Sequence, residues 1–288
     1  MKVAHTPDDL AVADRAVAIG SFDGVHRGHQ SILAAARSAG LTSTAVTFWP
    51  HPRTVLGNRV ELLSSLERRL ELLADTGIDE TLVVAFTPEL AKLEARAFAE
   101  SLLRRIGTTA IAVGESFRFG RGAAGDAALL SELGFDVRIV PTVEAISSSR
   151  IRQQMRAGEP EAAARLLGRP PEIEGVVVLG DQRGGTLGYP TANLDVPADL
   201  LVPAYGIYAG AALGHRAAIS VGVNPHYGGT ERRIEPYLLD FEGDLYGRRL
   251  VVELWQRLRD ERAFSGEDEL VAQIARDVEA TRAAVRPA

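Results

Sequence analysis

The sequence predicts two domains, an α/β domain with a parallel sheet followed by a small antiparallel β domain. The chain has 288 residues, which is longer than one typical small domain and long enough for two domains of ordinary size. Short apolar runs alternate with helical patterns from residue 17 to about residue 140, whereas β-type stretches follow one another after residue 173. Pro170 and Pro171 end the helical segment between these halves, so we predict domains of residues 1–168 and 169–288.

The first half alternates strand-like and helix-like segments. The expected strands are residues 16–20, 43–48, 81–86, 109–114 and 135–140. The expected helices are residues 29–40, 65–77, 93–107 and 126–134. In the third helix, Leu93, Phe98, Leu102 and Ile106 fall on one face and Gly107 follows as a stop. This alternation is typical of βαβ units, which build a parallel sheet with helices on both faces.

The second half reads as short strands broken by Gly, Pro and Asn. They are expected at residues 172–180, 206–214, 215–223, 233–241 and 248–258, which favours a small antiparallel barrel or sandwich. A terminal helix is expected over residues 265–285, with Ser265 as its N-cap. Its apolar face comprises Leu270, Val271, Ile274 and Val278.

Composition excludes several classes of protein. Apolar residues make up 46% and charged residues 24%, as in globular proteins, and the absence of Cys excludes disulfides and thiol chemistry. The net charge of −6 and the lack of a dense basic run argue against nucleic-acid and membrane partners. The N-terminus lacks a signal-peptide pattern, and we therefore expect a cytoplasmic protein.

A Gly-rich turn connects the first predicted strand to the first predicted helix. In "GSFDGVHRGH", Gly20, Gly24 and Gly28 permit a tight backbone close to a ligand, and the helix N-terminus offers unpaired N–H groups to phosphate. His26 and His29 should project on the same side, where they can share the oxygens of one phosphate chain. The alternatives are a turn with surface histidines and, less well supported, a metal site, for which Asp23 would be the one further ligand nearby.

A second Gly-rich stretch, "LGDQRGGTLGYPTANLD", spans residues 179–195. Gly180 and Gly188 belong to an irregular loop whose N–H groups can face phosphate, and Thr191 and Asn193 offer neutral oxygen ligands two residues apart. Mg²⁺ accepts such ligands once ATP supplies the charge. The alternative is an ordinary long hairpin loop.

Several motifs, in this order and spacing, resemble prokaryotic bifunctional riboflavin kinase/FAD synthetases. In the first half they are "GSFDGVHRGHQ", "TFWPHP", "GESFRFGRGAAGD" and "ISSSRIR". In the second half they are "PTANL", "AYGIYAG", "SVGVNPHYGG" and "IEPYLLDFEGDLYG", followed by "LRDERAFSGEDELVAQIARD". The resemblance implies a Rossmann-like nucleotidyltransferase domain and a six-stranded barrel.

In the first domain, the resemblance implies that ATP lies over the turn that contains His26 and His29, with both histidines on its phosphates. The turn residues are Gly20, Ser21, Phe22, Asp23 and Gly28. Ser147, Ser148 and Arg152 would close on the β and γ phosphates. FMN would lie near two segments, which contribute Pro50, His51 and Pro52 and then Ser116, Phe117 and Phe119.

In the second domain, the resemblance implies that Thr191 and Asn193 bind Mg²⁺ and ATP, and that Glu235 takes the proton from the riboflavin 5′-hydroxyl. A carboxylate at the start of a strand would otherwise be a solvated edge residue. Some positions depart from the family pattern. They are Ser21, Trp49 and Ser116 in the first domain and Gly184, Gly185 and His226 in the second.

The function implied is phosphorylation of riboflavin to FMN, followed by adenylylation of FMN to FAD. The partners are then riboflavin, FMN, FAD, ATP, ADP and pyrophosphate, the metal is Mg²⁺ brought by ATP, and a homo-oligomer is left open. One alternative is a riboflavin kinase whose first domain has a weak or altered adenylyltransferase activity. Another is a non-catalytic flavin-nucleotide sensor, although a sensor has no use for a base such as Glu235.

Overall fold

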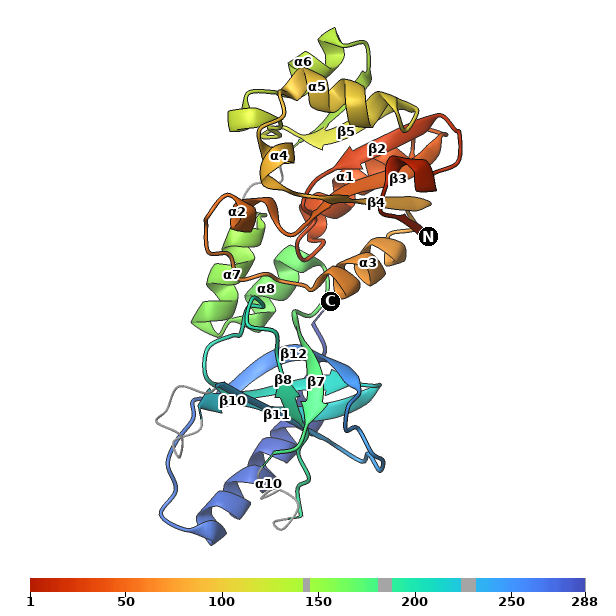
Figure 1. Ribbon diagram of the computed structural model, residues 1–288. Helices are drawn as coiled ribbons and strands as arrows, with labels where there is room; N and C mark the ends of the chain where they lie inside the picture. The colour runs from red at the N-terminus through yellow and green to blue at the C-terminus, as the bar shows by residue number, and fades with distance from the viewer. Residues whose placement is uncertain (142–145, 181–187, 224–231, 288) are drawn as a thin grey trace. The chain divides into compact units, whose positions relative to one another are not determined.

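The chain forms two compact units in a computed structural model, which describes residues 1–141, 146–180, 188–223 and 232–287 (Figure 1). Unit 1 comprises Met1–Val60 and Ser65–Ser147, and unit 2 comprises Glu61–Ser64 and Ser148–Ala288. Two helices that precede residue 168, α7 (Ser148–Ala157) and α8 (Pro160–Leu167), therefore belong to unit 2 by their contacts. The domain boundary between residues 168 and 169 stays a prediction.

Unit 1 is built on a parallel sheet with the strand order β1-β4-β3-β2-β5-β6. The strands are β1 (Lys2–Ala4), β2 (Arg15–Ile19), β3 (Thr42–Trp49), β4 (Glu80–Ala85), β5 (Thr108–Gly114) and β6 (Asp136–Val140). All five expected strands are present. The strand β1 was not predicted, because three residues are too few to display a strand pattern, and pairing with β4 is what makes this segment a strand.

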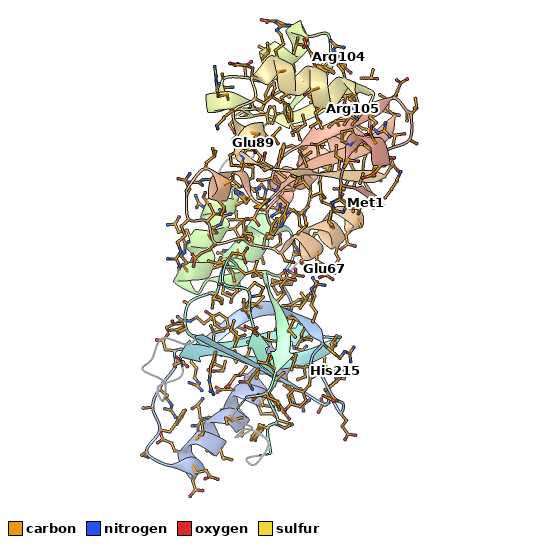
Figure 2. All side chains as sticks on the ribbon, viewed as in Figure 1. Met1, Glu67, Glu89, Arg104, Arg105 and His215 are labelled. Atoms are coloured by element: carbon orange, nitrogen blue, oxygen red, sulfur yellow. The ribbon has the colours of Figure 1, made fainter. Side chains whose placement is uncertain are left out.

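Helices cover both faces of this sheet, as predicted. Alternate residues of β2 point to opposite faces, so Ala16 and Ala18 pack with α1 and α3, whereas Val17 and Ile19 pack with α5, η2 and α6. Figure 2 shows the side chains that fill these layers. The helical segments of unit 1 are η1 (Pro7–Asp9), α1 (Arg27–Arg37), α2 (Pro52–Val55), α3 (Leu66–Asp75), α4 (Pro88–Ala91), α5 (Ala95–Phe98), the π-helix η2 (Ala99–Arg104), η3 (Arg121–Ala123) and α6 (Ala127–Glu132).

The predicted helix over residues 93–107 is divided into α5 and the π-helical η2, yet its apolar face is as expected. Phe98 and Ile106 are buried, and Leu93 and Leu102 pack against the same core. Gly107 ends the segment with a φ of 72°, and a Cβ there would lie 2.2 Å from the carbonyl oxygen of Ala13. Only glycine therefore fits at this stop.

Unit 2 contains a six-stranded antiparallel sheet with the order β11-β10-β9-β12-β7-β8. The strands are β7 (Glu172–Val178), β8 (Asn193–Asp195), β9 (Gly206–Ala212), β10 (His215–Val223, whose first residue is labelled in Figure 2), β11 (Arg232–Leu238) and β12 (Arg249–Arg259). The two end strands, β8 and β11, approach each other. The N–H of Ala192, directly before β8, donates to the carbonyl of Pro236 in β11 at 3.0 Å. The sheet is therefore a nearly closed barrel. Of the two architectures that the sequence left open, the barrel is confirmed and the sandwich is excluded.

The terminal helix α10 (Glu267–Ala283) begins at Gly266, so the prediction that Ser265 is the N-cap was wrong. Ser265 instead donates its N–H and its hydroxyl to the Glu269 carboxylate. The acidic residues in the first turn of α10 already stabilise the positive end of the helix dipole. The helix therefore does not need Ser265 as its cap, and Ser265 contacts Glu269 from outside the helix. None of the helices in the described part of the chain combines the length and the apolar composition that a membrane-spanning segment requires.

The helices α7 and α8 share a core with the barrel. Ile151, Met155, Ala163 and Leu167 belong to the same buried cluster as the inward-facing barrel side chains. The segment 61–64 also joins unit 2, since the Leu62 N–H donates to the Asp199 carbonyl at 2.7 Å and its carbonyl accepts from Leu201 at 2.8 Å. The barrel core is therefore larger than the strands alone provide.

Candidate active sites

The first candidate site lies at the carboxyl edge of the parallel sheet. The Gly-rich turn follows β2, "PHP" follows β3 and "SFRF" follows β5. Because β3 and β5 flank β2 on either side, the three predicted ligand segments leave neighbouring strands at the same edge. This is the edge at which open parallel sheets bind ligands.

The turn after β2 has an unusual backbone that its surroundings hold in place. Phe22 and Val25 have positive φ values of 49° and 39°, in addition to Gly24 at 77°. A positive φ at a β-branched residue such as Val25 is strained and persists only where packing enforces it. Phe22 is fully buried, and the Thr47 hydroxyl donates to the Ser21 carbonyl at 3.1 Å. The turn is therefore a rigid platform in front of α1.

His26 and His29 lie against each other at this platform. Their rings are stacked with centroids 3.6 Å apart, as the spacing predicts. His26 is the N-cap of α1, and its Nδ1 accepts from the His29 N–H at 3.2 Å. In the neutral ring the proton of His26 is therefore on Nε2, which makes Nε2 a donor. A Cβ on Gly28 would approach the His26 ring to 3.3 Å, so this glycine gives the ring its room.

The electrostatics favour a neutral His29. Burial lowers the pKa of His29 well below the usual value, and the neighbouring His26 and Arg69 lower this pKa further. Its Nδ1 is buried and has no hydrogen-bond partner in the described part of the chain. At neutral pH the pair therefore consists of one capped imidazole and one uncharged imidazole, whose remaining N–H donors suit a phosphate oxygen.

Ser148 and Arg152, the residues that were expected to close on the ATP phosphates, begin α7 in unit 2, and Ser147 directly precedes them. Arg152 is buried, and its Nε donates to the Glu61 carbonyl at 2.6 Å. Their roles toward ATP stay predictions.

The expected flavin segments have ordered local structure. His51 is buried and caps α2, with its Nδ1 accepting from the Arg53 N–H at 3.2 Å, between Pro50 and Pro52. Phe117 and Phe119 stack at 5.5 Å, and Phe119 also contacts Phe98 at 5.8 Å.

Both of these phenylalanine rings pack against the core of unit 1, whereas Ser116 is exposed. The segment is thus an edge of the core, and contact with a flavin stays a prediction.

The second candidate site is a cavity of about 280 Å³ in unit 2, between the barrel and the start of α10. It brings the predicted ligand Thr191 and the predicted base Glu235 together, although they lie 44 residues apart in the sequence. The Ala192–Pro236 hydrogen bond explains this, since it joins the residues next to each of them. The cavity is lined by Tyr189, Thr191, Ile207, Ala218, Ser220, Glu235, Tyr237, Arg259, Glu261, Arg262, Phe264, Leu270, Ile274 and Asp277.

Charges surround Glu235 in this cavity. Arg233 Nη1 lies 3.4 Å from its carboxylate. Burial raises the pKa of Glu261 above its usual value. The positive charge of Arg259 lowers this pKa, and the nearby Glu235 raises it. The charges of Glu261 and Glu235 therefore interact within this cavity.

Asn193 packs directly on Gly180. A Cβ on Gly180 would lie 2.2 Å from the Asn193 amide nitrogen and 2.5 Å from its amide oxygen, so only glycine accommodates this amide. The structure thus joins two of the predicted ATP-binding residues, while Gly188 adopts a φ of 84°. The neutral oxygens of Thr191 and Asn193 fit Mg²⁺, which prefers hard oxygen ligands and keeps phosphate and water in its shell.

The described residues contain no group of three or more His, Asp or Glu that could hold a metal by itself. Gly184, Gly185 and His226, the departures in the second half, lie outside the described residues.

Sequence reasoning missed several residues of the barrel cavity. Tyr189 and Tyr237 meet edge to face at 5.4 Å, and the Arg262 guanidinium lies 4.8 Å from the Phe264 ring centroid. The aromatic residues beside "PTANL" and in "RAFSG" were the available signal, because a cavity for a planar apolar ligand needs such side chains.

Comparisons with known proteins agree on both halves. Residues 10–154 match the family model described as FAD synthetase, and residues 167–285 match the model described as riboflavin kinase. A solved structure titled a macrolide-efflux protein from Streptococcus pneumoniae is 32% identical, with a TM-score of 0.87 over 97% of this chain and 98% of that chain.

Curated relatives extend over nearly the whole chain. The bifunctional riboflavin kinase/FMN adenylyltransferase of Listeria monocytogenes is 36% identical, covering 96% of this chain and 95% of that protein. The protein of the same name from Escherichia coli is 37% identical, covering 90% of this chain and 89% of that protein. With both family models matched in order, this chain belongs to the family of bifunctional riboflavin kinase/FMN adenylyltransferases.

Proposed function

We propose that unit 2 phosphorylates riboflavin to FMN at the barrel cavity, and that the carboxyl edge of the sheet in unit 1 serves the adenylylation of FMN to FAD. The observation that carries the kinase assignment is the meeting of Thr191 and Glu235 in one cavity. The stacked His26–His29 pair on a strained turn supports the adenylyltransferase assignment.

In the kinase reaction, Glu235 accepts the proton of the riboflavin 5′-hydroxyl as its oxygen attacks the γ-phosphorus of ATP, and ADP leaves. The cavity meets two requirements of this step. Its aromatic and aliphatic lining gives a planar ring system an apolar environment, and Glu235 stands at the same wall as Thr191. Arg233 beside Glu235 helps to hold the carboxylate in one orientation.

In the adenylylation reaction, a phosphate oxygen of FMN attacks the α-phosphorus of ATP, and pyrophosphate leaves. Neither histidine needs to transfer a proton in this step. The Nε2–H of His26 donates to phosphate oxygens, and neutral His29 lies beside it, so charge that develops on phosphorus meets donors fixed by the helix cap. The rigid turn keeps these donors from having to reorganise during the reaction.

Magnesium fits the oxygen donors of Thr191 and Asn193 in unit 2. When it is bound with ATP, Mg²⁺ neutralises phosphate charge and helps to orient the γ-phosphate. The contribution of this chain is the placement of the two donors, and Gly180 leaves room for the amide of Asn193.

The decisive experiment incubates the full chain with ATP, Mg²⁺ and either riboflavin or FMN, and separates the flavins by chromatography. We expect FMN and FAD from riboflavin, and FAD from FMN. FMN without FAD would refute the adenylyltransferase assignment, and FAD from FMN but not from riboflavin would refute the kinase assignment.

A further inference from the structure

A buried arginine lies beneath the turn that contains the His pair. Arg69, on α3, is 0% exposed, and its Nη1 donates to the Phe48 carbonyl at 3.3 Å. Nε and Nη2 are buried and have no hydrogen-bond partner among the residues that the structure describes. A buried guanidinium with two unsatisfied donors is costly for the fold, so its presence requires an explanation.

A second buried arginine of the same unit shows what a structural arginine looks like. Arg15 is 1% exposed and lies at the start of β2, at the opposite end of the strand from the turn. Its Nε pairs with Glu80 at 2.9 Å, and its two Nη atoms donate to backbone carbonyls at 2.7 to 3.1 Å. Full pairing is thus attainable within this unit, and Arg69 lacks it.

The neighbours of Arg69 belong to the predicted ATP and flavin segments. Its Nη2 lies 3.9 Å from the carboxylate of Asp23, which is also fully buried, in the turn itself. Its guanidinium carbon lies 5.4 Å from the ring centroid of Trp49, at the end of β3. Trp49 thus covers one side of the cation with an aromatic ring, and among the described residues no hydrogen bond from Nη2 accompanies its ion pair with Asp23.

The charge of Arg69 reaches the His pair. Burial lowers the pKa of the Arg69 guanidinium and Asp23 raises it, but an arginine so placed stays protonated at neutral pH. In turn, Arg69 from α3 and His26 from the adjoining turn both help to lower the pKa of His29. A fixed positive charge that keeps His29 neutral also attracts the phosphates of a nucleotide.

We propose that Arg69 is a positioning residue for nucleotidyl transfer, which anchors Asp23 from beneath the turn and places a fixed positive charge behind the His26–His29 pair. The inference rests on the proposed function of that pair. Because it is fully covered, Arg69 acts through its neighbours and the field it creates, and not by touching the nucleotide.

The test compares Arg69→Met and Arg69→Lys with the matched control Arg15→Met in the full chain. For each variant, kcat and KM for ATP are measured for FAD formation from FMN, and riboflavin phosphorylation in the same preparation serves as an internal reference. We expect Arg69→Met to lower kcat for FAD formation at least about 10-fold relative to Arg15→Met, with phosphorylation within about twofold. Arg69→Lys should recover most of this loss, because it restores the charge.

A spectroscopic measurement separates the electrostatic role from a general loss of packing. Titration of the His29 imidazole by NMR should show a higher pKa in Arg69→Met than in the wild type, and no change in Arg15→Met. If Arg69→Met does not fold, the double variant Asp23→Asn/Arg69→Met removes both buried charges and is judged by the same criteria. An equal kcat in the Arg69 and Arg15 variants, with an unmoved His29 pKa, overturns the proposal.

His29→Ala distinguishes failure of this inference from failure of the proposed function. If His29→Ala forms FAD at the wild-type rate, the role of the histidine pair is wrong and the inference fails with it. If His29→Ala loses FAD formation while Arg69→Met retains it, the pair keeps its role and only the inference about Arg69 is refuted.

Discussion

Replacing Gly180 by Ala should disable the kinase with little effect on the fold. The added Cβ would lie 2.2 Å from the Asn193 amide nitrogen, and the three closest atoms all belong to that amide. The amide must therefore retreat by about 1 Å to reach an ordinary contact, and a displacement of that size at a positioning group costs roughly 10²-fold in rate. We expect kcat for riboflavin phosphorylation to fall by about that factor.

The assay is conversion of riboflavin to FMN under saturating ATP and Mg²⁺, with FAD formation from added FMN as the reference reaction. Gly266→Ala is the matched control, because no atom lies within 4 Å of a Cβ at that position and its φ of −171° suits any residue. Wild-type phosphorylation in Gly180→Ala, with thermal unfolding also unchanged, would mean that the position of the Asn193 amide does not matter. The assignment of Asn193 to ATP and Mg²⁺ would then be wrong.

Three further predictions concern the two sites and the units that contain them. His29→Ala should lower FAD formation from FMN by about 10²–10³ and leave phosphorylation unchanged, whereas Glu235→Gln should lower phosphorylation by about 10²–10⁴ and spare FAD formation. Loss of both reactions in either folded variant, measured by flavin chromatography, would contradict the two-site assignment. The pKa of His29 in the folded protein lies well below its usual value of about 6.5. Below that pH the unfolded state binds a proton that folded His29 does not, so the free energy of unfolding falls on acidification by up to about 1.4 kcal/mol per pH unit. Urea unfolding at pH 7.5 and 5.5 should show a smaller loss in His29→Gln than in the wild type, and equal losses would argue against a depressed pKa. A fragment starting at Gly168 should phosphorylate riboflavin but unfold more readily, by about 2 kcal/mol or more, than one starting at Ser148, since it lacks the α7 and α8 side chains of the shared core. An inactive Gly168 fragment beside an active Ser148 fragment would place the functional boundary at α7.

Regular elements were predictable where their pattern is local. Residues 16–19 form a short continuous apolar run, which is typical of a strand buried on both faces. The short strand β1 and the position of the α10 cap were not predictable in this way. The first depends on pairing with β4 far along the chain, and the second depends on the Glu269 carboxylate, which accepts from the Ser265 N–H and hydroxyl.

The sequence by itself determined the types of residue at each site and their local spacing. His26 and His29 are three apart where a strand meets a helix, so the sequence predicted that they lie on one side, and the N-cap position of His26 brings the two rings into contact. Thr191 and Asn193 were likewise recognisable as candidate ligands within one Gly-rich stretch, whereas Glu235 became a candidate base only through the family resemblance.

Only the tertiary structure decided which of these residues meet and what surrounds them. Thr191 reaches Glu235 because the end strands of the barrel approach each other, and strand pairing between distant segments leaves no local pattern. Arg69 carried no signal among the other charges of "SLERRLELL", where a solvated side chain is the ordinary expectation. Burial beneath the turn, beside Asp23 and without partners for two of its donors, is a property of the assembled core, because burial and pairing depend on segments brought together by folding.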